Sequence, residues 1–359
     1  MKYWSILFIM HTFAIPSLCS AMDCLAEITY IPNPTCVAFL DDYRVVIGGD
    51  RCITLNLINA KTRQLDPTQI FHITLSNDGT RFALSSRKKL AIFSTFTEKQ
   101  RWKQKPLTEG SAIVFSPTGS SLFAYFPGKL TSYNWLDKEL ETHGVQSFTQ
   151  FPTVLISCHP TEKKLLYPSS ANTLSTIDPD NDYAIEKVCT TKDPVIAGTY
   201  GPDGNIIAVN NHYRGCCLYN PKTKYCCNLL LNIYENIVGI AFHKSRPILV
   251  VLIDNNAIQY WNYRTNALIA TRTGTTDPQD WIDYPYLTQR LAFSPNGEKL
   301  IVALKNKCLV LQVPKNNIIM LYRLLKHHGI LPEIIKLILY KLALFFKFHQ
   351  INFAELIKT

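Results

Sequence analysis

The stretch RLAFSPNGEKLIVALKNKCLVLQV, residues 290–313, contains the clearest copy of a unit that recurs along the chain back to Thr35. An apolar segment ends in Phe293, and the turn Ser-Pro-Asn-Gly follows it. Two further apolar segments, residues 299–304 and 308–313, are separated by the polar residues 305–307. Short apolar runs bounded by turn residues are typical of β-strands, so the unit is predicted to form three consecutive strands.

Two columns of residues repeat with the same spacing. The first column is the residue that ends the strand before each turn: Phe39, Leu75, Phe115, Cys158, Tyr200, Phe242 and Phe293. The second column ends the third strand of each unit: Ile58-Asn59, Phe93-Ser94, Tyr133-Asn134, Ile177-Asp178, Tyr219-Asn220 and Trp261-Asn262. A spacing of roughly 40 residues with several short strands per unit is typical of propeller blades. The predicted fold is therefore an all-β, seven-bladed β-propeller with a short C-terminal α-helical extension.

The turn motifs resemble those of the WD40-like β-propellers. The matching segments are AFSPNG (292–297), VFSPTG (114–119), TYGPDG (199–204) and IQYWNYRTNAL (258–268), in which Trp261-Asn262 replaces the Trp-Asp of the family. Most copies have Asn or Ser where the family has Asp, and no Gly-His dipeptide opens a blade. The resemblance covers residues 25–314 and implies a propeller domain, which we place at residues 22–314.

The first 21 residues have the pattern of a cleaved secretory signal peptide. Lys2 precedes an apolar run over residues 3–18, and the small residues Cys19 and Ala21 occupy the −3 and −1 positions. Pro16 interrupts the run, which is also short for a membrane span. We therefore expect an exported protein, periplasmic or secreted. An uncleaved anchor and an apolar first strand are the alternatives.

Residues 25–31 are predicted to be the strand that closes the ring. The last unit contains only three predicted strands, near 287–293, 299–305 and 308–313, so its blade lacks a fourth. An N-terminal strand that pairs with residues 308–313 would complete this blade. The same pairing would cover an open sheet edge, which is otherwise prone to aggregation.

Two segments interrupt the regular spacing. The insertion at 271–288 contains Trp281, Tyr284 and Tyr286, which are candidate interface residues because exposed Trp and Tyr often anchor protein contacts. Packing of these rings on their own blade is the alternative. The acidic turn DPDND at 178–182 has spacing like that of a calcium loop but lacks the central Gly and the distal Glu. We expect a solvated turn there and no metal site.

Ten of the eleven cysteines follow the predicted cleavage site. If residues 220–223 form a four-residue loop, Cys217 faces Cys226 across a hairpin, and these two residues are candidates for a disulfide. Buried, reduced thiols are the alternative. No CxxC pair is present, so a zinc ribbon is not expected. His159 and His243 occupy turn positions where other copies have Ser, and we interpret them as turn residues.

Residues 315–359 are predicted to form a helical segment with a largely apolar stretch at 331–348. The opening of that stretch resembles an F-box at Leu331, Pro332, Glu333, Ile334, Ile338, Leu339 and Leu342. The F-box resemblance implies docking on an adaptor of ubiquitin ligases, and a helical hairpin packed on its own propeller is the alternative. Three surfaces could cover the apolar side chains: the propeller flank, a groove in a partner protein, or an acidic membrane surface.

The chain carries a formal charge of +10, and residues 315–359 contain seven Lys and Arg against two Glu. This charge favours acidic surfaces, but no nucleic-acid-binding motif accompanies it, so nucleic acid ranks last among the partners. No nucleophile elbow, Walker A, HExxH or Rossmann motif is present. The sequence therefore predicts a non-enzymatic platform that binds a protein partner and needs no cofactor. The alternative is a hydrolase or lyase with its site at the axial channel.

Overall fold

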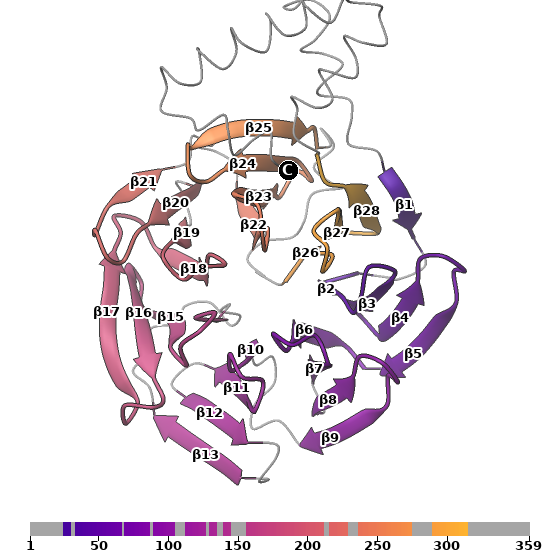
Figure 1. Cartoon of the computed structure of the whole chain (residues 1–359), viewed down its shortest axis with the longest axis horizontal. Helices are drawn as coiled ribbons and strands as arrows, with labels where there is room; N and C mark the ends of the chain where they lie inside the picture. Colours follow the sequence, from indigo (N-terminus) through magenta and orange to yellow (C-terminus); the bar gives the residue numbers. More distant parts are fainter. Residues whose placement is uncertain are drawn as a thin grey trace, which may run out of the picture. The chain divides into compact units, whose positions relative to one another are not determined.

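The computed structural model describes residues 24–29, 33–66, 68–86, 89–104, 112–126, 129–134, 139–144, 156–211, 215–228, 236–274 and 289–314. Over these residues, strands β1 to β28 form seven antiparallel sheets of four strands each. The sheets surround a central axis as the blades of a propeller (Figure 1). The predicted all-β, seven-bladed fold is confirmed, and the predicted C-terminal helices lie beyond the described part of the chain.

The strands follow one another outward from the axis in blades 1 to 6. Blades 1 and 2 comprise β2 (Cys36–Phe39), β3 (Arg44–Gly48), β4 (Cys52–Asn56), β5 (Thr62–Asp66), β6 (Ile70–Leu75), β7 (Arg81–Ser86), β8 (Leu90–Ser94) and β9 (Gln100–Gln104). Blades 3 and 4 comprise β10 (Ala112–Phe115), β11 (Ser121–Phe126), β12 (Lys129–Asn134), β13 (Glu139–Gly144), β14 (Ser157–Cys158), β15 (Leu165–Ser170), β16 (Thr173–Asp178) and β17 (Ala184–Thr190). Blades 5 and 6 comprise β18 (Val195–Tyr200), β19 (Ile207–Asn211), β20 (Gly215–Tyr219), β21 (Cys226–Asn228), β22 (Ile237–Phe242), β23 (Ile248–Ile253), β24 (Ile258–Asn262) and β25 (Ala267–Arg272).

Blade 7 contains strands from both ends of the chain, in the order β26 (Leu291–Phe293), β27 (Lys299–Ala303), β28 (Cys308–Gln312) and β1 (Cys24–Ile28). In the antiparallel pair of β1 and β28, Ile28 lies opposite Cys308 and Ala26 opposite Val310. The predicted closure of the ring by the N-terminal strand is therefore confirmed, although the strand is 24–28 and not 25–31. Ile28 is buried in the apolar cluster between blades 7 and 1.

The first repeat column of the sequence marks the last residue of the innermost strand in all seven blades. The second column marks the end of the third strand in blades 2 to 6, but its assignment in blade 1 is wrong. There β4 ends at Leu55-Asn56, three residues before the predicted Ile58-Asn59. The reason is local, because the Asn56 carboxamide oxygen accepts the backbone N–H groups of Ile58 at 2.9 Å and Asn59 at 3.3 Å, and so Ile58-Asn59 belongs to the turn.

The Ser-Pro-Asn-Gly motif encodes the turn between the first and second strands. The Ser294 hydroxyl accepts the N–H of Lys299 at 2.9 Å, and Gly297 adopts a φ of 72°, which favours glycine. In blades 4 and 6 a histidine replaces this serine, as predicted. His159 Nδ1 accepts the N–H of Glu162 at 3.1 Å, and His243 Nδ1 accepts the N–H of Arg246 at 3.0 Å.

The core lies between neighbouring blades and not at one centre. Six apolar clusters each join one blade to the next, and the cluster between blades 7 and 1 includes Ile28, Phe39, Ile47, Ile301 and Val310. Each fully buried side chain of this size contributes about 1.5–3 kcal/mol. Strands whose two faces both meet a neighbouring blade read as continuous apolar runs, as in ILVVLI of β23, which is buried throughout. No helix among the residues described here is long and apolar enough to span a bilayer.

The predicted insertion begins later than the spacing indicates. Thr271 and Arg272 belong to β25, where Thr271 lies opposite Gln259 and Arg272 opposite Ile258. The insertion therefore starts after this strand, and its residues 275–288 fall outside the described ranges.

One buried histidine predicts acid sensitivity. His72 on β6 is 2% exposed, and burial lowers its pKa from 6.5 to about 4. The unfolded chain therefore takes up a proton near pH 6.5, whereas the folded chain resists it until about pH 4. Stability should fall by about 3 kcal/mol as the pH drops through this window. Urea unfolding from pH 7 to pH 4 should show a shallower decline for His72→Gln than for the parent, and equal slopes would contradict the assignment.

Candidate functional site

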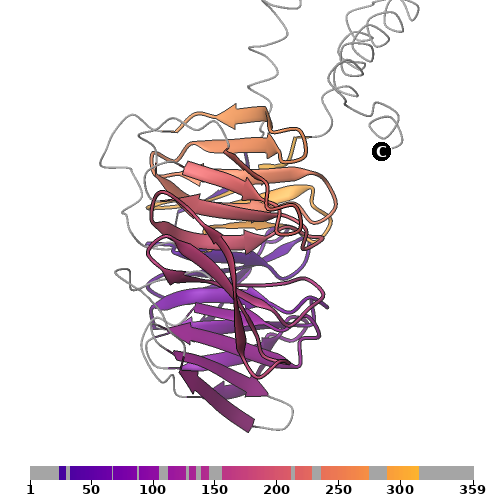
Figure 2. The same cartoon turned by 90° about the vertical axis from the view of Figure 1, so that its left-hand side faces the viewer.

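The strands run between two faces of the ring (Figure 2). We call one of them the turn face: it carries the turns that follow the first and third strands of each blade. Because neighbouring strands are antiparallel, β1 also begins and β28 also ends at this face. The turn after the third strand is tied to the turn after the first strand. In blade 1 the N–H of Leu57 donates to the Tyr43 carbonyl at 2.7 Å, and in blade 2 the N–H of Thr95 donates to the Thr80 carbonyl at 3.0 Å.

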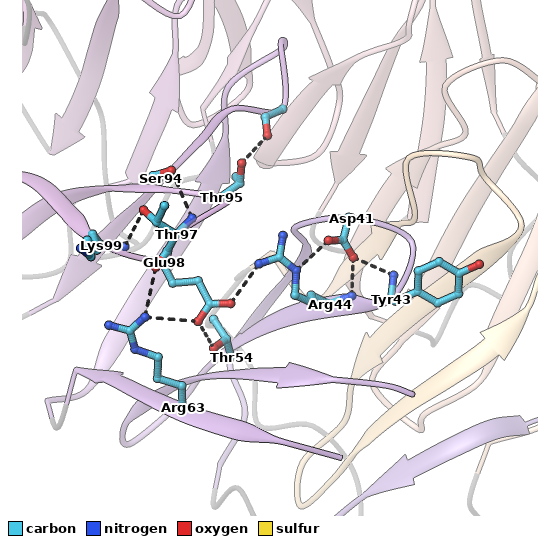
Figure 3. A network of polar contacts seen from close by, with 11 residues as sticks. Asp41, Tyr43, Arg44, Thr54, Arg63, Ser94, Thr95, Thr97, Glu98 and Lys99 are labelled. Carbon is cyan, nitrogen blue, oxygen red and sulfur yellow. Dashed lines mark hydrogen bonds and ion pairs between the residues drawn. The ribbon is translucent and has the colours of Figure 1, made fainter. Parts of the chain in front are cut away.

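A buried carboxylate joins blades 1 and 2 on the turn face. Glu98, in the turn between β8 and β9, accepts from the Thr54 hydroxyl at 2.7 Å and from Arg44 Nη1 at 3.2 Å (Figure 3). Arg63 approaches the same carboxylate at 3.9 Å and donates to the Thr97 carbonyl at 3.2 Å. The Glu98 side chain is only 13% exposed, so these contacts are screened less than a surface ion pair. They hold the turn of blade 2 in place against β4 and β5 of blade 1.

Arg44 connects this network to the first turn of blade 1. Its Nε donates to an Asp41 carboxylate oxygen at 2.7 Å, and the other Asp41 oxygen accepts the N–H of Tyr43 at 2.8 Å. These hydrogen bonds and the charge of Arg44 lower the pKa of Asp41 and outweigh its partial burial, which acts in the opposite direction. The carboxylate therefore stays ionised and holds the Tyr43 backbone in a fixed position.

Three large apolar side chains protrude around this network. Tyr43, Ile58 and Phe96 are 52%, 71% and 73% exposed. Ile58 and Phe96 occupy the same position in consecutive turns, each two residues after the residue that ends the third strand. Tyr43 also has the ammonium group of Lys299, from blade 7, 4.5 Å from its ring centroid. We call Tyr43, Ile58 and Phe96, together with Arg44, Arg63 and Glu98, the turn-face patch.

The exposed charges beside the patch are mostly positive. Residues 57–63 and 95–101 contain four cations, Lys61, Arg63, Lys99 and Arg101, all exposed, and one carboxylate, the largely buried Glu98. The equivalent turn of blade 4, residues 179–185, has the opposite sign, because it contains Asp180 and Asp182 and no cation, and Asp180 pairs with Lys163. One face of the ring therefore presents turns of contrasting charge on a common backbone framework.

The axial cavity of about 260 Å³ is lined mainly by the innermost strands. Its polar lining comes from His72, Thr74, Asn77, Ser157, His159, Thr199, Asn210 and Gln289. No Asp, Glu, Lys or Arg is among the described lining residues, and the imidazole groups in this wall are those of His72 and His159. The channel-enzyme alternative stays an untested prediction.

The acidic turn at 178–182 is organised by its own backbone. The Asp178 carboxylate accepts the N–H of Asp180 at 3.1 Å, and the Asp180 carboxylate pairs with Lys163 at 2.6 Å. Among the residues that the structure describes, no group of three or more His, Cys, Asp or Glu side chains is placed to hold a metal ion.

The predicted pairing of the cysteine hairpin is wrong. Cys217 lies opposite Asn228, and Cys226 lies opposite Tyr219. Asn220 causes the shift, because its N–H donates to the Tyr225 carbonyl at 2.9 Å and its carboxamide caps the N–H of Lys222 at 2.9 Å. The turn is therefore 221–224 and not 220–223.

Cys217 and Cys226 are free thiols, and a hydrogen bond between their side chains brings them together diagonally. Burial and the neighbouring thiols raise the pKa of Cys217, so the thiolate that attacks an oxidant is scarce. A disulfide between these residues stays a prediction.

The remaining predicted site residues lie outside the described part of the chain. They are Trp281, Tyr284 and Tyr286 in the insertion and Leu331, Pro332, Ile334, Ile338 and Leu342 in the C-terminal segment. The predicted signal peptide, residues 1–21, is also outside it.

The turn-face patch was not among the predicted site residues. A signal was present in blade 2, where Phe96 is the only apolar residue of the turn segment 95–99, whereas the sequence pattern assigned Ile58 to the end of a strand. No family model and no curated protein matches this chain.

Proposed function

We propose that this protein is a non-enzymatic interaction platform whose turn face binds a protein partner. The observation that carries the proposal is the turn-face patch, in which Ile58 and Phe96 are more than two thirds exposed on a framework fixed by Glu98. Exposed apolar side chains that gather at one place on a rigid scaffold are typical of protein interfaces. The β-propeller fold is itself often used as such a platform.

The fixed backbone beneath Ile58 and Phe96 supports a role of these exposed side chains in binding. The backbones of the two turns are fixed by hydrogen bonds to neighbouring turns and strands, so less conformational entropy is lost when a partner binds. The predicted contact residues of the insertion and of the C-terminal segment enter the proposal as additional contacts. An F-box-like adaptor role and contact with an acidic membrane are special forms of it that rest on the sequence alone.

Site-specific photo-crosslinking in the producing cell tests the proposal. A benzophenone side chain is placed at position 58 or 96 of the full chain, and at position 185 as a matched control. Ile185 is 50% exposed on β17 of blade 4, away from the patch. We expect a protein adduct of discrete mass from positions 58 and 96 and none of that mass from position 185. No adduct at either patch position, or the same adducts at all three, would refute the proposal.

A further inference from the structure

We propose that the partner segment bound by the turn-face patch is acidic and carries large apolar side chains. This inference rests on the proposed function and adds the chemistry of the partner. It follows from the charges and the apolar side chains that the patch presents together on two consecutive blades.

Charge is the first argument. Lys61, Arg63, Lys99 and Arg101 are exposed beside the patch, and the carboxylate in the same turns, Glu98, is occupied by Arg44 and Thr54. Glu98 is already bonded and mostly covered, and the two carboxylates beside Tyr43, Asp41 and Asp42, lie next to the cations Arg44 and Lys299. The net charge that an approaching partner meets is therefore positive. Complementary charge steers such a partner to the patch and raises its association rate.

Apolar anchoring is the second argument. Phe96 and Ile58 project from turns whose backbones are fixed, and Tyr43 stands beside Ile58 because its carbonyl accepts the N–H of Leu57. A phosphate surface, or the backbone of a nucleic-acid duplex, would use the cations but leave the exposed Ile58 and Phe96 side chains without an apolar partner. A peptide with acidic residues interspersed with Leu, Ile or Phe satisfies both requirements.

Charge also disfavours two other occupants. The segment 315–359 of the same chain has seven cations and two carboxylates, so it would meet the patch with like charge. A symmetric dimer through the patch would bring two copies of the same net-positive surface together, because a twofold interface uses the same patch on both copies. In both arrangements like charges repel each other, whereas an acidic partner would be attracted to the patch.

A peptide selection tests the inference on the full chain. A random dodecapeptide phage library is selected against the immobilised protein, and the enriched peptides are measured by fluorescence anisotropy. We expect enrichment of Asp and Glu together with Leu, Ile or Phe. Affinity should fall by about tenfold or more for Phe96→Ser and for the charge reversal Lys61→Glu/Lys99→Glu. It should also fall between 50 and 500 mM salt, because salt screens exposed charges.

The control variant is Ile185→Ser, which removes an apolar side chain that is 50% exposed on blade 4 and should leave peptide affinity unchanged. Thermal unfolding of Phe96→Ser should match that of the parent, since the side chain is exposed. Enrichment without acidic residues, no enrichment, or affinity that survives charge reversal would overturn the inference. Patch-dependent adducts in the crosslinking experiment would then still support the proposed function.

Two further measurements address other occupants. Binding to vesicles of 30% phosphatidylserine that is lost in Lys61→Glu/Lys99→Glu would overturn the inference in favour of a membrane surface. Concentration-dependent dimerisation in sedimentation experiments that is lost in Phe96→Ser would overturn it in favour of a second copy.

Discussion

A chain that lacks residues 22–33 should unfold at a temperature on the order of 10 °C lower than the full chain and should aggregate on heating. The deletion removes β1, and with it Ile28 from the cluster between blades 7 and 1. The lost burial and the weakened cluster amount to several kcal/mol, and each kcal/mol shifts the melting temperature by a few degrees in a domain of this size. β28 then becomes an exposed edge strand, which is a template for pairing between chains.

Two point variants separate the effect of losing strand β1 from the effect of losing the buried side chain of Ile28. Leu25→Ser changes a residue of β1 that is 48% exposed and should leave the melting temperature nearly unchanged. Ile28→Ser changes a residue that is 3% exposed and should reproduce part of the loss without aggregation, because the strand still covers the edge. A deletion variant that melts with the parent and stays monomeric would show that β1 does not close the ring. Calorimetry with light scattering gives both readouts.

The ring could be predicted because its period is encoded by local turn chemistry. A serine or histidine that accepts backbone N–H groups recurs after the innermost strand, and a glycine with positive φ follows the serines, as in Ser294 and Gly297. The same short motif therefore recurs in the sequence at each of these turns. The closure by β1 followed from counting strands, since one blade was a strand short.

Another repeated feature left no readable trace in the sequence. The fourth residue after the end of the third strand has positive φ in four blades, with values of 54°, 52°, 49° and 55° for Ala60, Glu98, Asp182 and Asn266, and in blade 5 the fifth residue, Lys224, has a φ of 58°. The side chains at this position differ in chemical type. The hydrogen bonds of the turn, and not the side chain, therefore impose the backbone conformation. The misplaced second column in blade 1 and the misplaced cysteine pairing both have this origin. In blade 1 the strand ends at Asn56, three residues earlier than predicted, and in blade 5 the hydrogen bonds of Asn220 shift the turn by one residue.

The turn-face patch could not be derived from the sequence because exposure depends on neighbours from other blades. Glu98 meets Arg44 and Thr54, which lie more than forty residues away in the chain. Apolar residues at turn positions are visible in the sequence, but only the packing of the blades shows that Ile58 and Phe96 remain uncovered. If a neighbouring blade covered Ile58 and Phe96, the same two side chains would belong to the core.

Replacing Gly297 with Ala should destabilise the protein by about 2–4 kcal/mol, whereas the same change at Gly79 should cost only about 1 kcal/mol. Both glycines have positive φ, 72° and 68°, so both substitutions incur the backbone cost of a side chain in that region. They differ in what surrounds the new methyl group. At Gly297 it would lie 2.2 Å from His243 Nε2, and at Gly79 no atom lies within 4 Å.

His243 cannot easily move aside, because every polar atom of its ring is bonded. Its Nδ1 accepts the N–H of Arg246 at 3.0 Å, and its Nε2 lies 3.0 Å from the Gly297 carbonyl oxygen and 2.9 Å from Arg246 Nε. Burial lowers the pKa of His243 to about 4, which keeps the ring in this neutral, singly protonated form. The ring also packs edge-on against Phe293, at 4.9 Å between centroids.

Urea unfolding of five chains tests this interlock between blades 6 and 7: the parent, Gly79→Ala, Gly297→Ala, His243→Ser, and the double variant Gly297→Ala/His243→Ser. Serine restores the side chain that other blades use at this turn, so it keeps an acceptor for the turn N–H groups and frees the space for the methyl group. The double variant should therefore be more stable than the sum of the single losses predicts. Equal losses at Gly297 and Gly79, or additive losses in the double variant, would show that the histidine ring does not constrain the glycine.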